Sequence, residues 1–190
     1  MTLLFDPTTH TYTYNGQRMI SVTEAIKAVG LIDDRWFTEE ATWRGSVVHR
    51  VCELDDLGTL DEDSVDPAAQ GYLEAWRAAK SNLDLRFSDI EKPKVNGNYG
   101  FAGTPDRIGL SRTKKVVIDL KTGAEAPWHG LQLAAYAAFD HPFAATYHRF
   151  TIRLQPDGKY SLTKYEDYWG DWAAFHGALA VAKWRLKYAA

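Results

Sequence analysis

The amino-acid sequence predicts a mixed α/β fold in which a central mixed β-sheet is flanked by helices. The predicted elements follow one another as a hairpin, helices, several strands, a helix, more strands and a final helix, an order typical of this class. Hydrophobic residues make up 45% and charged residues 25% of the 190-residue chain, as in ordinary globular proteins. The sequence has no internal repeat, low-complexity tract or linker. One domain spanning residues 1–190 is therefore expected.

The N-terminal segment is expected to form a β-hairpin followed by a short helix. In HTYTYNGQRMIS, residues 10–21, Tyr and Thr alternate before an Asn15-Gly16 pair, which is a strong hairpin signal. Ser21 and Glu24 have the spacing of a capping box, which would begin a helix that Gly30 ends.

Two longer helices are predicted next. Residues 38–57 have helical periodicity, with an apolar stripe that comprises Trp43, Val47, Val51 and Leu54. Residues 55–66 are acidic and are expected to form a loop. Asp66 and Pro67 supply an N-cap and a first-turn proline for a second helix, which reaches about Asn82. Its apolar side comprises Tyr72, Leu73, Trp76 and Ala79.

Strands dominate the rest of the chain. RFSDIEKPKV and NYGFAG are predicted strands on either side of an Asn-Gly-Asn turn. A hairpin over residues 103–123 follows, and then an Ala-rich helix over residues 127–139. TYHRFTIRLQ and KYSLTKYE are predicted to pair around a Pro-Asp-Gly turn. The last helix is expected over residues 169–188.

The hairpin GTPDRIGLSRTKKVVIDLKTG carries an acid on each arm. If its tip comprises residues 111–114, Leu110 pairs with Lys115, and Asp106 falls opposite Asp119. Directly opposed like charges destabilise a sheet unless a cation lies between them. Lys121 shares a face with Asp119 because alternate residues of a strand point the same way. The arrangement is either a metal site or an accident of exposed strand ends.

These residues have the chemistry needed to hydrolyse a phosphodiester. Carboxylate oxygens are hard ligands that suit Mg²⁺ or Mn²⁺. A bound metal ion can polarise a phosphoryl oxygen and lower the pKa of a bound water. Lys121 would orient or deprotonate that water, or offset charge on the phosphate. The alternative is that both acids and the lysine are solvated surface charges.

Several motifs of the chain resemble those of the PD-(D/E)XK nuclease superfamily. Pro105-Asp106 followed by Asp119-Leu120-Lys121 matches its defining pattern. The phrases GFAGTPDRIG, VVIDLKTG and LQLAAYA are similar to successive motifs of RecB-like exonuclease domains and phage-type nucleases. Upstream, WRGSVVHRVCE resembles their Gly-x-x-x-His helix. The resemblance implies a restriction-endonuclease-like core with a catalytic core at about residues 38–155.

The resemblance also implies roles for individual residues. Lys121 would be the catalytic lysine, with Asp106 and Asp119 beside it. Gln132 and Tyr136 match a Gln-x-x-x-Tyr motif expected near the DNA backbone and the active site. The implied metal ligands are His49, Asp106, Asp119 and the backbone carbonyl of Leu120.

Two glutamates are left with open roles. Glu53 lies four residues after His49, so both share a helix face and could approach a metal ion, but Glu53 could equally begin the acidic loop. Glu91, before the hairpin, could reach the site or be an exposed strand residue. The acidic residues that follow Glu53 in the sequence are interpreted as solvated: Asp55, Asp56, Asp61, Glu62 and Asp63.

The bulk properties limit the partners. Cys52 is the only cysteine, which excludes an internal disulfide and a cysteine-ligated zinc or iron–sulfur site. The N-terminus does not resemble a signal peptide, and no apolar run is long enough to span a bilayer. We therefore expect no membrane partner and a cytoplasmic protein, in the host cytoplasm if it is phage-encoded.

The first functional hypothesis is a Mg²⁺- or Mn²⁺-dependent deoxyribonuclease acting on DNA as an exonuclease. A structure-specific or restriction-like endonuclease on the same fold is the near alternative, and a non-catalytic nucleic-acid-binding protein is the distant one. The net charge of −3 is not that of a strongly basic nucleic-acid binder, although a local groove matters more than the total. The sequence leaves open whether the chain forms a homo-oligomer or binds a recombination or replication partner.

Overall fold

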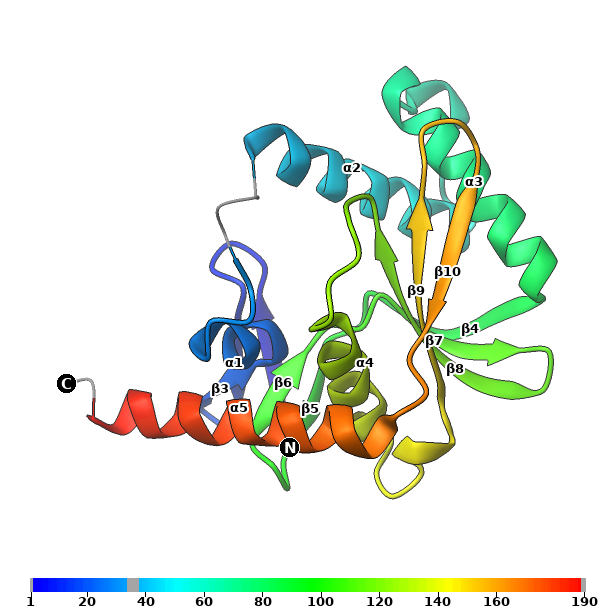
Figure 1. Cartoon of the computed structure of the whole chain (residues 1–190). Helices are drawn as coiled ribbons and strands as arrows, with labels where there is room; N and C mark the ends of the chain where they lie inside the picture. Colours follow the sequence, from blue (N-terminus) through cyan, green and yellow to red (C-terminus); the bar gives the residue numbers. More distant parts are fainter. Residues whose placement is uncertain (1, 34–37, 189–190) are drawn as a thin grey trace.

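The computed structural model describes residues 2–33 and 38–188. It has a mixed α/β fold with two mixed β-sheets flanked by helices, consistent with a restriction-endonuclease-like core (Figure 1). The expected domain bounds, 1–190, also include residues that lie outside the described part of the chain.

The first sheet has the order β1-β2-β3-β6-β5. Its strands are β1 (Leu3–Asp6), β2 (Thr11–Tyr14), β3 (Gln17–Ser21), β5 (Lys94–Asn96) and β6 (Phe101–Gly103). The predicted β2–β3 hairpin is confirmed, and Asn15 and Gly16 have the positive φ angles, 50° and 80°, that its two-residue turn requires. β3 and β6 are parallel, which joins this hairpin to the middle of the chain.

The second sheet has the order β10-β9-β8-β7-β4. Its strands are β4 (Leu85–Ile90), β7 (Arg107–Ser111), β8 (Lys114–Lys121), β9 (His148–Leu154) and β10 (Tyr160–Lys164). Leu110 pairs with Lys115, so the predicted register of the β7–β8 hairpin is confirmed. The predicted β9–β10 hairpin also forms, and β8 and β9 run parallel.

The prediction of one strand over RFSDIEKPKV was wrong. β4 ends at Ile90 and β5 begins at Lys94, and the two strands belong to different sheets. Glu91 between them has φ 44°, in the left-handed region, and its backbone N–H donates to the carbonyl of Asp106 at 3.0 Å. The chain therefore turns at Glu91 instead of continuing as a strand.

The helices begin and end close to the predicted residues. They are α1 (Val22–Ala28), α2 (Glu39–Asp56), α3 (Pro67–Leu83), α4 (His129–Ala137) and α5 (Tyr168–Tyr188), with short 3-10 helices at Glu62–Ser64, Ala138–Asp140 and Ala144–Thr146. The capping box of α1 forms, because Glu24 N–H donates to Ser21 Oγ and Ser21 N–H donates to Glu24 Oε2. Within residues 2–33 and 38–188, none of the helices combines the length and apolar character needed to cross a membrane.

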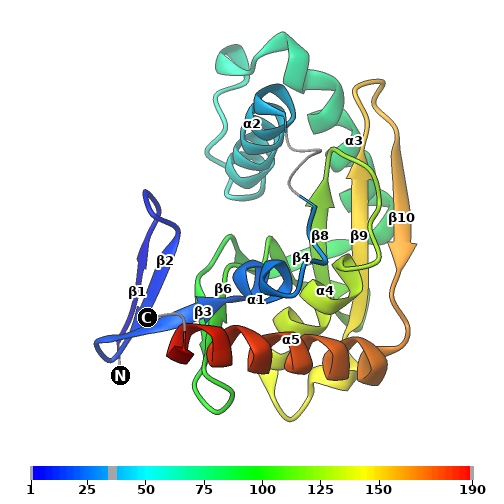
Figure 2. The same ribbon diagram turned by 60° about the vertical axis from the view of Figure 1, so that its left-hand side comes forward.

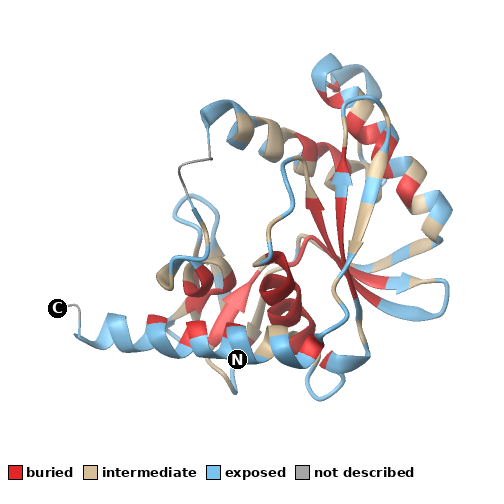
Figure 3. Ribbon diagram, viewed as in Figure 1, coloured by how far each residue is buried: buried red, intermediate tan, exposed pale blue. Residues whose placement is uncertain are grey.

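The second sheet separates two helical layers. Val116, Ile118 and Leu120 of β8 pack with α3 and α2, whereas Val117 lies in the other core cluster with α1, α4 and α5. Figure 3 shows buried segments on both α3 and α4. Asp119 and Lys121 alternate with Leu120, so they share the face of Val117. The strand thus directs Val116, Ile118 and Leu120 into the α2–α3 core, and Val117, Asp119 and Lys121 toward the α4 side.

The predicted apolar stripe of α2 was only partly right. Val51 is buried, but Trp43 is 54% exposed, and the other buried residues of the helix are Val48 and Cys52. Val48 and Cys52 pack in the cluster with the second sheet, while Val51 packs with α3 residues in a separate cluster. The helix therefore buries a wider arc than one stripe, because it contacts both the sheet and α3.

Gly109 in β7 is expected to tolerate no side chain. A Cβ built on Gly109 would lie 2.0 Å from the backbone oxygen of Arg86, beside the bulge of β4. Gly109→Ala should therefore lower the free energy of unfolding by about 1–3 kcal/mol, the usual cost of overpacking. Urea denaturation measures this loss. Gly123→Ala, where a Cβ would meet no atom of residues 2–33 and 38–188 within 4 Å, is the matched control. Equal stability of the two variants would contradict the packing of β4 on β7.

Candidate metal centre and active-site cleft

A cleft of about 440 Å³ lies between the β1–β2 hairpin and α2. Figure 2 shows the β1–β2 hairpin at the left and α2 at the top, with β8, β9 and β10 of the second sheet at the right. The residues predicted for the site line this cleft: His49, Glu53, Asp106, Asp119, Lys121, Gln132 and Tyr136. Glu91 lines it as well.

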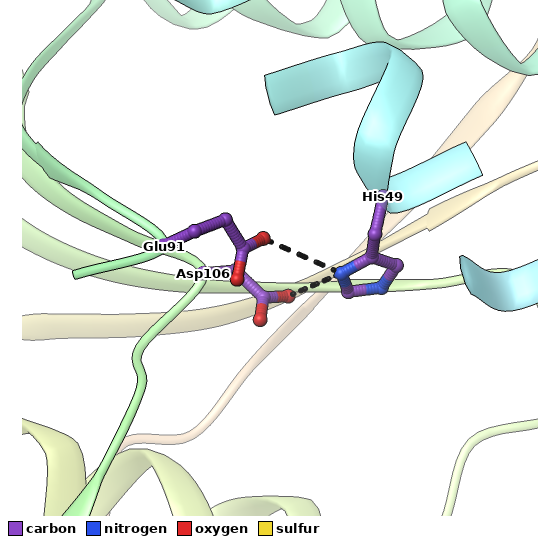
Figure 4. A group of neighbouring side chains, drawn as sticks. All are labelled: His49, Glu91 and Asp106. Carbon is purple, nitrogen blue, oxygen red and sulfur yellow. Dashed lines mark ion pairs between the residues drawn. The ribbon is translucent and has the colours of Figure 1, made fainter. Parts of the chain in front are cut away.

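Three side chains at the base of the cleft could hold a metal ion. His49 on α2, Glu91 at the turn after β4 and Asp106 just before β7 each offer one ligand atom, and these atoms lie within 4.8 Å of one another. His49 Nδ1 is 3.5 Å from Glu91 Oε1 and 3.6 Å from Asp106 Oδ2 (Figure 4). Three elements far apart in sequence thus converge on one point.

Backbone contacts fix the orientation of this group. His49 Nε2 lies 3.1 Å from the backbone carbonyl of Leu120, which can only accept, so Nε2 carries the hydrogen and Nδ1 faces the carboxylates. Asp106 Oδ2 accepts the backbone N–H of Leu120 at 2.6 Å. The carbonyl of Leu120 was predicted as a metal ligand. In the structure it contacts Nε2 of His49, on the side of the ring away from the two carboxylates.

The charges of the group are strongly coupled. Burial lowers the pKa of His49, but the carboxylates of Asp106 and Glu91 outweigh it, so this pKa rises to about 9. Burial raises the pKa of Asp106, although the positive charges of His49 and Lys121 oppose the rise. A proton on His49 and a metal ion are alternative ways to neutralise the same carboxylates.

Asp119 and Lys121 form a second group beside the first. Asp119 is 1% exposed, and its Oδ2 lies 2.5 Å from Lys121 Nζ. Burial raises the pKa of Asp119 despite this lysine. Lys121 Nζ also donates to Gln132 Oε1 at 3.4 Å and lies 5.3 Å from the ring centre of Trp128. The lysine is thus held by contacts on three sides.

Gln132 and Tyr136 extend this group along α4. Gln132 Nε2 donates to Tyr136 Oη at 3.2 Å, and both side chains are 5% exposed. Burial raises the pKa of Tyr136 well above its ordinary value, so the phenol stays protonated. Gln132 accepts from the lysine and donates to the tyrosine, which fixes the orientation of its amide.

The two glutamates with open roles are placed differently. Glu91 belongs to the group with His49 and Asp106, whereas Glu53 lines the cleft and accepts from Arg50 Nη1 at 2.8 Å. The signal for Glu91 in the sequence was its position before the hairpin. The direction of the Glu91 side chain depends on the left-handed backbone conformation of this residue. No local pattern of residues 86–95 indicates that conformation.

The interpretation of Asp55 and Asp56 as solvated was wrong. The side chain of Asp56 is 1% exposed and accepts from Arg107 Nε at 2.6 Å, Lys80 Nζ at 2.6 Å and the Trp76 indole. Arg107 is itself fully buried and also donates to Glu91 Oε1 at 3.0 Å and to the carbonyl of Asp106 at 2.7 Å. Asp55 pairs with Arg77 and Lys80. This buried ion-pair network lies directly behind the metal-binding group.

Comparison with known proteins assigns no family. No protein-family model matches the sequence. No curated protein matches it. Among solved structures, SSO0001 has a TM-score of 0.39 and 15% identity over 88% of this chain and 90% of that chain. LHK-Exo, in complex with dAMP, has a TM-score of 0.35 and 12% identity over 90% of this chain and 93% of that chain. These TM-scores and sequence identities are too low to support an inference about activity.

Proposed function

We propose that this chain is a metal-dependent deoxyribonuclease that hydrolyses phosphodiester bonds with the residues of the cleft. The observation that carries the proposal is the convergence of His49, Glu91 and Asp106 beside the Asp119–Lys121 pair. Supporting it, the sequence around these residues resembles the PD-(D/E)XK pattern. The substrate would be DNA, with exonuclease action expected, and the domain would span residues 1–190 with its catalytic core at about 38–155.

The donor set fits a divalent ion. One imidazole nitrogen and two carboxylates, all within 4.8 Å, offer the ligand types and the spacing that an ion with bonds of about 2.0–2.3 Å requires. The oxygen-rich set suits Mg²⁺ or Mn²⁺. We propose His49, Glu91 and Asp106 as ligands, with Asp119 completing the set. The carbonyl of Leu120 contacts Nε2, on the opposite side of the His49 ring from Nδ1, so it would become a ligand only if this ring turned. Glu53 would need to leave Arg50 to join them.

The chain's own residues supply the rest of the chemistry. A bound divalent ion would polarise the phosphoryl oxygen and lower the pKa of a water molecule. Lys121 Nζ would donate to that water or to a phosphate oxygen and so hold the nucleophile in line with phosphorus. Gln132 would position the lysine through its Oε1 contact, and Tyr136 would hold the amide of Gln132.

Metal affinity is expected to rise with pH. The metal ion must displace the proton of His49, whose pKa is raised to about 9, so affinity should increase by up to about tenfold per pH unit below pH 9 and then level off. In the metal-free chain the raised pKa stabilises the fold below about pH 6.5, and that contribution is lost as pH rises through about 9.

Mn²⁺ titration by calorimetry at several pH values between 6 and 9.5 measures this dependence, with about one proton released per ion at pH 7. His49→Gln should flatten the slope. An affinity of the unsubstituted chain that does not change with pH would contradict the participation of His49.

Cleavage assays test the proposed activity. Labelled linear and closed circular DNA, single- and double-stranded, are incubated with the chain and Mg²⁺, Mn²⁺ or EDTA. We expect metal-dependent loss of linear DNA and no loss after Lys121→Ala. Cutting of circles would assign an endonuclease on the same site. Binding of DNA without cleavage in either metal would contradict the proposal and favour a nucleic-acid-binding protein. Size-exclusion chromatography with light scattering of the same samples would show whether the chain forms a homo-oligomer.

A further inference from the structure

Three aromatic rings line the wall of the cleft that faces α2. They are Phe5 on β1, Tyr12 on β2 and His10 in the connection between the strands. Phe5 stacks on Tyr12 with ring centres 4.7 Å apart, and His10 meets both rings edge-on at 5.3 and 5.6 Å. Tyr12 is 1% exposed, whereas Phe5 is half-buried and His10 is exposed. The proposed chemistry uses none of these rings.

The wall is held in place relative to the metal-binding group. Tyr12 Oη lies within 2.8 Å of Thr104 Oγ1, two residues before Asp106. Asp6 fixes the connection that carries His10, because its carboxylate accepts from Thr8 N–H at 2.9 Å and from Thr9 Oγ1 at 2.8 Å. Phe5 and Tyr12 are direct cross-strand partners. A ligand bound at Asp106 therefore lies beside a preformed aromatic surface.

The cleft continues beyond these rings. A second cavity of about 430 Å³ shares His10, Ser21 and Thr23 with the first, and it is lined further on by Lys27 and Trp128. His10 therefore lies where the two cavities meet. A strand whose phosphate is at the metal-binding group would pass the rings as it leaves the cleft.

We propose that Phe5 and His10 form an aromatic platform for an unpaired nucleobase of the strand whose phosphate lies at the metal-binding group. The base would stack on one ring and meet the other edge-on, because the two ring planes are 89° apart. The substrate class of the cleft is then DNA with a single-stranded segment next to the scissile bond. Aromatic rings stack on any base, because every base has a π-face. In an intact duplex both faces of a base are covered by its neighbours, so a paired base cannot use the platform unless it is unstacked. This inference rests on the proposed nuclease function.

Binding of a DNA strand that carries the fluorescent base 2-aminopurine tests the platform. Lys121→Ala is the background, so that the strand stays intact in Mn²⁺. A single-stranded oligonucleotide should bind to the Lys121→Ala variant, and the fluorescence of its 2-aminopurine should be quenched on binding. Adding Phe5→Leu, which keeps an apolar side chain without a ring, should relieve the quenching and weaken binding by about 5- to 100-fold, the usual effect of losing one base–aromatic stack. His10→Asn, which tolerates the left-handed φ of 51°, should act in the same direction.

Leu4→Ala is the matched control, because Leu4 precedes Phe5 in β1, is 62% exposed and does not line the cleft. With Leu4→Ala added, the Lys121→Ala variant should bind the oligonucleotide as tightly, and quench its 2-aminopurine as strongly, as without it. Unchanged quenching and affinity in both Phe5→Leu and His10→Asn would overturn the platform, as would blunt duplex bound as tightly as single strands. If the unsubstituted chain cleaves nothing but Phe5-dependent quenching persists, the nuclease proposal fails and the platform is supported as a binding site.

Discussion

Replacing Asp106 by Asn is expected to lower metal-dependent DNA cleavage by about 10³-fold, because the substitution removes a charge aimed at the proposed metal position. Asp106 accepts from the backbone N–H of Leu120 and lies 3.6 Å from His49 Nδ1. An amide keeps the shape but offers only one acceptor oxygen. The same change should weaken Mn²⁺ binding and lower the pKa of His49, because the charge of Asp106 helps to raise this pKa.

The kinetic comparison uses initial rates of cleavage of end-labelled DNA in Mn²⁺, with Mn²⁺ affinity measured on the same samples. Asp157→Asn is the control, because Asp157 pairs with Lys159 at the surface turn before β10, away from the cleft residues, and its side chain is 50% exposed. An Asp106→Asn variant that retained more than about a tenth of the rate would be incompatible with a ligand role for Asp106.

Arg107→Met is expected to lower the free energy of unfolding by about 3–5 kcal/mol, the cost of removing one partner from a buried ion pair. Arg107 is 0% exposed, packs against the ring of Trp76 and connects Asp56 to Glu91. Methionine replaces the aliphatic part of the side chain but leaves the carboxylate of Asp56 with Lys80 as its one cation among the described residues. The melting temperature should fall by about 6–20 °C.

Arg77→Met is the matched comparison for this effect. Arg77 belongs to the same network, through Asp55 and Glu62, but its side chain is 42% exposed, so its loss should cost at most about 1 kcal/mol. Urea denaturation of both variants measures the difference. Because Arg107 also tethers Glu91, its replacement should weaken Mn²⁺ binding, whereas Arg77→Met should not. Equal stability losses in the two variants would contradict the importance of burial in this network.

Local patterns in the sequence were sufficient to predict the β7–β8 hairpin and most helix boundaries. The register of Leu110 with Lys115 follows from the polar tip, and the start of α1 follows from the capping box at Ser21 and Glu24. The same register explains why Asp106 and Asp119 line one cleft, since alternation along β8 directs Asp119 and Lys121 to one face. These features depend on neighbours in the chain, which is why they could be predicted.

Features that depend on distant contacts could not be predicted in this way. Glu91 joins the metal-binding group only because the chain turns at a left-handed residue held by Asp106. Asp56 looked like part of an acidic loop because its cation, Arg107, comes from a strand 51 residues later. The first sheet pairs β3 with β6 across a long stretch of chain, and nothing in either segment indicates the other.

A crystal of the chain soaked in Mn²⁺ and measured at the manganese absorption edge is the most direct test of the proposed metal site. We expect an anomalous peak within about 2.0–2.5 Å of His49 Nδ1 and of carboxylate oxygens of Glu91 and Asp106, and no peak there in the Asp106→Asn variant. A fully soaked crystal with no peak in the cleft, or with manganese bound away from these three residues, would contradict it.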